Sequence, residues 1–132
     1  MEGLQEYRNA IAEIQAVDMP INDEFIQKLD GPIKIIRQFL EPKGGILLVE
    51  VAELQLLCRI PSRQILEEIN KRIKNLDAFE SDRLLLSRCL IYPSIDVVNG
   101  WVESGSPGVV SSASRKLLQE AKILEDATAK KF

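Results

Sequence analysis

The stretch "ILLVEVAELQLLCRI", residues 46–60, decides whether this chain is purely helical or also contains strands. As a helix it would have no single buried face, because its polar residues scatter around the helical axis. As two strands that turn at Ala52-Glu53, it gathers its apolar residues on one face, which is what an antiparallel hairpin requires. The sequence therefore predicts a β-hairpin over 46–60. Its apolar face consists of Leu47, Val49, Val51, Leu54, Leu56 and Cys58.

The register of the predicted hairpin follows from the position of its turn. A two-residue loop at Ala52-Glu53 pairs Glu50 with Gln55 and Ile46 with Arg59 on the second, more polar face. The loop lacks the Gly or Asn that tight hairpin turns prefer. The prediction therefore rests on the alternation of side chains along the strands and not on the turn residues.

Helices are predicted on the N-terminal side of the hairpin. Apolar residues at helical spacing within 4–14 indicate an amphipathic helix, and Pro20 ends this first segment. Asn22 is placed to cap a short helix, with Asp30-Gly31 as its stop. Pro32 then occupies the first turn of "PIKIIRQFL", where the spacing of the apolar residues favours a helix over a strand.

Further helices are predicted after the hairpin. Ser62 is placed to cap the first of them, and Asp77 begins a capping box before "SDRLLLSRCLIY", a helix that Tyr92-Pro93 terminates. Ser94 caps a short helix, and Ser106-Pro107 starts the last one. We expect residues 125–132 to fray. The apolar side of the last helix consists of Val110, Ala113, Leu117, Ala121 and Leu124.

Together these elements predict a mainly α (α+β) fold, a compact helical domain with one inserted antiparallel β-hairpin. The 132 residues suit a single domain with one core. Within that domain we expect N-terminal helices in 1–41, the hairpin in 46–60 and a helical bundle in 62–127.

Composition excludes several classes of function. The net charge is −3 with scattered basic residues, which disfavours nucleic acid as the main partner because phosphate binding needs a concentrated basic face. No apolar run approaches the roughly 20 residues of a membrane span. The chain has no histidine, so triads, Cys–His pairs and histidine metal ligands are absent from it. We therefore predict a protein of the cytosol that is not an enzyme.

Candidate cofactor and metal motifs are weak. The "EPKGGI" segment lacks the spacing of a phosphate-binding loop, and Asp77, Glu80 and Asp82 lack the alternation of a calcium loop. Cys58 and Cys89 lie among apolar neighbours and belong to no CxxC pair, which predicts two buried, reduced thiols. We therefore predict no cofactor and no bound metal.

Two places in the sequence are candidates for contact with a protein partner. Trp101 falls in the short helix between two proline-bounded turns, where it is either a core residue or a partner anchor. Arg59 and Arg63 flank Pro61 at the end of the hairpin, where they either brace the junction or contact a partner. The candidate partner-binding residues are Val98, Trp101, Val102, Val109, Arg59 and Arg63.

The order of these elements resembles that of the tail assembly chaperones of tailed bacteriophages. The matching pieces are "ILLVEVAELQLLCRIPSRQILEEI", "RLLLSRCLIYPS" and "SPGVVSSASRKLLQEAKI", which together extend from Ile46 to Ile123. They contain an Arg-Pro-Ser-Arg step, a Leu-rich helix that ends in Cys and Tyr-Pro, and a Pro-Gly step before the final helix. The helices up to Leu40 have no counterpart in the resemblance.

The resemblance implies a binding protein without catalysis. Such chaperones coat the apolar, helical tape measure protein while tail tube protein polymerises around it, in the cytoplasm of the infected host. The expected partners are therefore the tape measure protein, tail tube or baseplate proteins, with self-association also possible. One alternative is a structural subunit retained in the virion, in the baseplate or tail hub. A second alternative is a small cytosolic regulatory binding protein.

Overall fold

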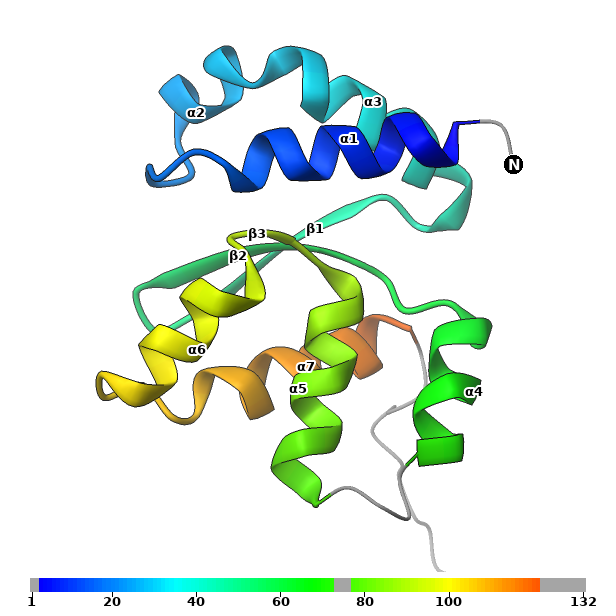
Figure 1. Ribbon diagram of the computed structural model, residues 1–132, viewed down its shortest axis with the longest axis vertical. Helices are drawn as coiled ribbons and strands as arrows, with labels where there is room; N and C mark the ends of the chain where they lie inside the picture. Colours follow the sequence, from blue (N-terminus) through cyan, green and yellow to red (C-terminus); the bar gives the residue numbers. More distant parts are fainter. Residues whose placement is uncertain (1–2, 73–76, 122–132) are drawn as a thin grey trace, which may run out of the picture.

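The computed structural model describes residues 3–72 and 77–121, and in this part of the chain a sheet separates two layers of helices (Figure 1). One layer contains α1 (Leu4–Gln15), α2 (Asp23–Lys28) and α3 (Asp30–Leu40), followed by the 3-10 turn η1 (Glu41–Lys43). The sheet contains β1 (Ile46–Val51), β2 (Leu54–Arg59) and β3 (Leu90–Tyr92) in the order β1-β2-β3. The other layer contains α4 (Arg63–Arg72), α5 (Ala78–Cys89), α6 (Ile95–Glu103) and α7 (Val109–Glu120). The mainly α (α+β) fold with an antiparallel hairpin is confirmed.

The hairpin forms with the predicted register. Glu50 pairs with Gln55 and Ile46 with Arg59, and the turn falls on the two residues between β1 and β2. Ala52 takes a left-handed conformation with φ of 54°, which a Cβ atom disfavours. The packing of the strands therefore imposes the turn on a sequence that does not prefer it.

The sheet has a hydrophobic core on each face. Leu56 and Cys58 point into the core formed with α4–α7, whereas Ile46 and Leu57 pack against the core formed with α1–α3. The expectation of one buried and one polar face was therefore incomplete. The second face is covered because the residues that it presents include Ile46, Leu57 and Ile91, which only the N-terminal helices can shield from water.

The third strand is the main difference from the predicted fold. The helix expected to run to Tyr92 ends at Cys89, and Leu90–Tyr92 pair antiparallel with β2 as β3. All three β3 residues are buried, and β2 gains hydrogen-bond partners along the edge that β1 does not occupy. The Tyr92-Pro93 peptide bond that follows is cis.

Local capping explains where three of the helices begin. Asn22 accepts a hydrogen bond from the Phe25 backbone N–H at 3.0 Å, as predicted. Ser62 Oγ accepts from Ile65 N–H at 3.2 Å, and Asp77 Oδ1 accepts from Glu80 N–H at 2.7 Å. These bonds satisfy N–H groups that have no partner within the helix.

One predicted helix boundary was wrong, and another was confirmed. The start expected at Ser106-Pro107 is displaced, since α7 begins at Val109 and no side chain caps it. The stop expected at Asp30-Gly31 is confirmed, since α2 ends at Lys28 with Leu29 as its C-cap, and α3 begins directly at Asp30. The buried side of α7 contains the predicted Val110, Ala113 and Leu117, whereas Leu124 and 125–132 lie outside the described residues.

Candidate partner-binding site

The candidate residues near Trp101, on α6 and at the start of α7, differ in their exposure to solvent. Val98 and Val109 are almost fully buried in the core beneath α6 and α7, so their side chains are not accessible to a partner in this structure. Trp101 and Val102 are half-buried and pack on the edge of the same core. Val97, which the sequence analysis did not single out, is 45% exposed. The accessible apolar surface of α6 is therefore centred on Trp101 and Val97.

A groove of about 540 Å³ adjoins this surface, and we call it the Trp101 groove. One wall is the connection between α1 and α2, residues 15–21, and another is the end of the hairpin, residues 53–55. Tyr92, Pro93, Val97 and Trp101 complete the lining. The groove therefore lies where the N-terminal helices, the hairpin and α6 meet, although these segments are far apart in the sequence.

The lining of the Trp101 groove mixes apolar and polar side chains, and its charged side chains are acidic. Asp18 and Glu53 are its carboxylates, and the described residues that line it include no Lys or Arg. An apolar side chain that enters beside Trp101 would be shielded from water, while a neighbouring Lys or Arg would meet opposite charge. The arrangement suits a partner segment that is apolar on one side and basic at its margin.

Arg59 and Arg63 lie on different layers of the molecule. Arg59 ends β2 and is half-buried, and its Nε has no hydrogen-bond partner among the described residues. Burial raises the pKa of Tyr7 in α1, and the nearby Arg59 guanidinium partly offsets this rise. Arg63 instead lies exposed on α4 and pairs with Glu67 at 3.0 Å. Arg59 therefore lies near Tyr7 of the N-terminal layer, and the two arginines do not form one compact site.

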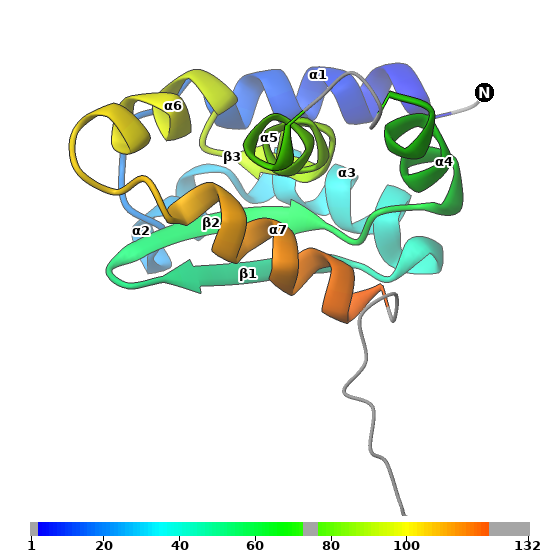
Figure 2. The same ribbon diagram turned by 90° about the horizontal axis from the view of Figure 1, so that it is seen from below.

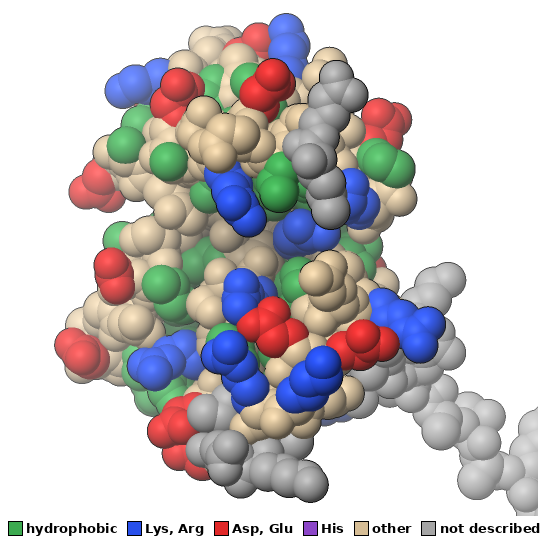
Figure 3. Space-filling view, turned by 45° about the vertical axis from the view of Figure 1, so that its right-hand side comes forward, with side chains coloured by type: hydrophobic (Ala, Val, Ile, Leu, Met, Phe, Trp, Pro, Cys, Tyr) green, Lys and Arg blue, Asp and Glu red, His purple; other side chains and the backbone are tan. Residues whose placement is uncertain are grey.

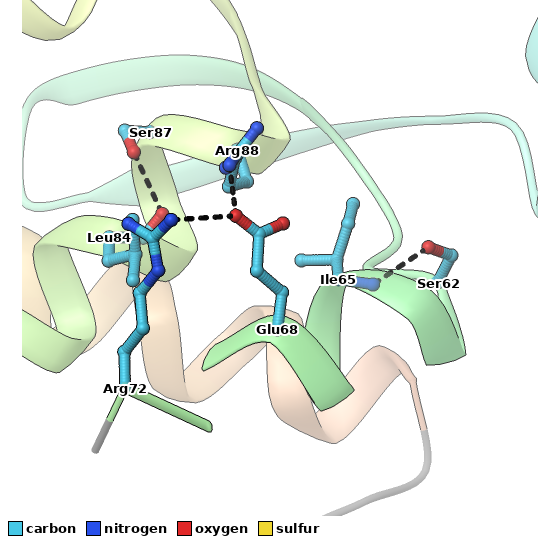
Figure 4. Close-up of polar contacts among 7 residues, drawn as sticks. All are labelled: Ser62, Ile65, Glu68, Arg72, Leu84, Ser87 and Arg88. Atoms are coloured by element: carbon cyan, nitrogen blue, oxygen red, sulfur yellow. Dashed lines mark hydrogen bonds and ion pairs between the residues drawn. The ribbon is translucent and has the colours of Figure 1, made fainter. Parts of the chain in front are cut away.

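An ion pair joins α4 to α5. Glu68 of α4 accepts a hydrogen bond from Arg88 of α5 and lies 3.7 Å from Arg72 (Figure 4). Lys and Arg side chains gather around the middle of one face of the molecule, and charges of both signs alternate below them (Figure 3). The Glu68–Arg88 pair holds α4 against α5, whereas the Glu68–Arg72 pair lies within α4.

Cys58 and Cys89 are buried and neither forms a disulfide, as predicted. Burial raises the pKa of Cys89 to about 12, against a smaller opposing effect of Arg59, and it raises the pKa of Cys58 further. Both thiols are therefore protonated at neutral pH. A protonated thiol is a poor nucleophile and a poor metal ligand.

Within residues 3–72 and 77–121, no cluster of three or more Cys, Asp or Glu side chains is placed to hold a metal ion. Among the same residues, no helix combines the length and apolar character needed to cross a membrane.

Comparisons with protein-family models, with curated proteins and with solved structures give no significant match to this chain. The fold is therefore characterised by its own architecture, a three-stranded antiparallel sheet between two helical layers. The candidate site is the Trp101 groove, which is lined by residues of both helical layers and of the sheet.

Proposed function

We propose that this protein is a non-catalytic binding protein of phage tail assembly, acting on the tape measure protein in the manner of the tail assembly chaperones that its sequence resembles. The observation that carries the proposal is the pairing of half-buried Trp101 and exposed Val97 at the edge of the Trp101 groove. An aromatic side chain that is anchored on one side and accessible on the other is typical of the centre of a protein interface.

The proposed partner segment is an amphipathic helix. Such a helix docks by laying its apolar stripe into a groove, and the tape measure proteins bound by the family are apolar and helical. Asp18 and Glu53 favour a helix whose apolar stripe is bordered by Lys or Arg. The proposed site of action is the cytoplasm of the infected host, where the tail is assembled.

Co-purification and virion analysis test this proposal. A tagged copy of this chain, produced during infection, is expected to retain the tape measure protein and to be missing from purified mature particles. Recovery of the chain in mature particles at a fixed copy number would instead identify the structural subunit of a baseplate or tail hub. If no tail protein is retained and the chain is absent from particles, the phage assembly proposal is wrong and a cytosolic regulatory role is favoured.

A further inference from the structure

Strand β1 has a free edge in the described part of the chain. Among those residues β1 pairs only with β2, and no hydrogen bond joins the backbone of Leu48 or Glu50 to another segment. The two-residue turn makes Val51 and Leu54 a hydrogen-bonded pair, so the N–H and C=O groups of Val49 and Leu47 also face β2. Those of Ile46, Leu48 and Glu50 consequently point away from the sheet.

This free edge is accessible from both faces of the sheet. On the side of α1–α3, a groove of about 780 Å³ is lined by Ile46, Leu48 and the exposed Ile26. On the side of α7, a second groove of about 460 Å³ is lined by residues 48–52 of the hairpin and by α7. Figure 2 shows β1 along the border of the sheet, on the side opposite β3.

The sequence of β1 does little to prevent the addition of another strand. Edge strands are commonly protected by Lys, Pro or a bulge, whereas β1 reads ILLVEV and pairs with β2 without a bulge. Leu48 is 49% exposed, the highest value among the exposed large hydrophobic residues within 3–72 and 77–121. An apolar strand with unpaired backbone groups is a template for pairing with a second strand.

We propose that two copies of this chain associate through antiparallel pairing of their β1 strands, centred on Leu48, to form one six-stranded sheet. This symmetric register places Leu48 opposite Leu48 of the second copy and Ile46 opposite Glu50 of the second copy. Leu48 is thereby withdrawn from water, and no like charges oppose each other within the new ladder. The inference concerns the isolated protein and does not depend on its role in tail assembly.

Charge complementarity favours a second copy as the occupant. Arg37, Glu41 and Ile46 all line the larger groove. Antiparallel pairing brings Glu50 of the second copy beside Ile46, and so to the groove that Arg37 lines. Arg37 has no ion pair among the described residues, although Glu41 also lines this groove. The twofold symmetry repeats the contact at the other end of β1.

Sedimentation equilibrium of the purified chain tests the proposal directly. We expect a dimer of the 14.9 kDa chain at micromolar concentrations. Leu48→Lys places two ammonium groups opposite each other and is expected to raise the dimer dissociation constant about thirtyfold or more. The matched control is Val97→Lys, because Val97 is similarly exposed but lies on α6, and it should leave the constant unchanged. A monomeric wild-type chain, or an equal response to both substitutions, would overturn the proposal.

Amide hydrogen exchange provides a measurement on the unaltered protein. The Leu48 and Glu50 N–H groups point to the free edge, so they should be protected in concentrated solution and exchange faster on dilution. The Val49 N–H faces β2 and should stay protected at both concentrations, which makes it an internal control. In addition, Arg37→Glu and Glu50→Lys should each weaken the dimer and should restore it when combined. Unchanged exchange at Leu48, or no restoration in the double variant, contradicts pairing in this register.

Discussion

The hydroxyl group of Tyr92 binds both backbone groups of Met19, a residue 73 positions earlier in the chain. It accepts a hydrogen bond from Met19 N–H at 3.0 Å and donates one to Met19 C=O at 2.5 Å. The Tyr92 ring also lies 4.8 Å from the Phe25 ring, measured between centroids. One side chain of β3 thus fixes the connection between α1 and α2, which is one wall of the Trp101 groove.

Removal of this hydroxyl should destabilise the fold. Tyr92→Phe retains the ring and its contact with Phe25 but leaves the Met19 N–H and C=O without their partner. We expect the free energy of unfolding to fall by about 1–3 kcal/mol, the cost of leaving partly buried polar groups unsatisfied. Urea denaturation measures this change, and an unchanged midpoint would show that water replaces the hydroxyl without loss.

The apolar face of the hairpin should contribute strongly to stability. Leu56 is fully buried between the sheet and helices α4–α7, so Leu56→Ala should lower the free energy of unfolding by about 2–5 kcal/mol. The control is Ile35→Ala, since Ile35 is an exposed residue of α3, and its effect should stay within about 0.5 kcal/mol. Similar losses from the two substitutions would be inconsistent with the burial that the structure assigns to Leu56.

The strained turn of the hairpin should improve on substitution by glycine. Ala52 has φ of 54°, and relief of its Cβ contact outweighs the extra freedom that glycine has in the unfolded chain. We expect Ala52→Gly to stabilise the protein by up to about 1 kcal/mol, measured as a rise in the denaturation midpoint. Ala12→Gly in the exposed middle of α1 is the opposite control, because there glycine should destabilise by about 1 kcal/mol. A lower midpoint for Ala52→Gly would show that the turn is not strained.

The hairpin register and three of the helix caps could be predicted because they depend on local patterns, although Ser94, also predicted as a cap, makes no side-chain capping bond. Glu50 and Gln55 can share the polar face only if the chain turns between them, and the bonds of Asn22, Ser62 and Asp77 span three residues each. Such features need only the periodicity and chemistry of neighbouring residues.

The third strand and the groove could not be predicted because they depend on distant contacts. Leu90–Tyr92 is too short to show a strand period, and its pairing requires the edge of β2. Helix α6 is apolar around much of its circumference, so its sequence does not reveal that Val98 is buried while Val97 is exposed. The side that faces the core is set by packing against α7, not by local pattern.

The two cysteines should react slowly in the native state and should make stability depend on alkaline pH. Their folded pKa values are raised above the ordinary 9.0, so above about pH 9 the unfolded chain releases protons that the folded chain retains. Stability should therefore be fully present below that pH and should decrease as pH rises through it. Alkylation before and after denaturation, with unfolding measured from pH 7 to 10, checks both statements. Rapid native alkylation of both thiols would contradict their burial.

Trp101→Ala should separate partner binding from folding. Trp101 is half-buried, so we expect a moderate loss of stability with an unchanged far-UV circular dichroism spectrum. Affinity for the tape measure partner should fall by about 2 kcal/mol or more, roughly thirtyfold, as is typical when an aromatic anchor is truncated. Phe79→Ala is the matched control, because Phe79 is an aromatic residue of α5 with 37% exposure, outside the groove, and it should not affect binding.

A second substitution keeps the Trp101 prediction testable if the alanine variant unfolds. Val97 lines the same groove and is exposed, so Val97→Asp alters the surface without opening a cavity in the core. An added carboxylate should place an unfavourable, desolvated charge against the apolar stripe of the partner and weaken binding at least about tenfold. Isothermal titration with a tape measure fragment measures the effect of both substitutions. If the folded Val97→Asp protein binds with unchanged affinity, the partner does not contact Val97 and does not occupy the Trp101 groove as proposed.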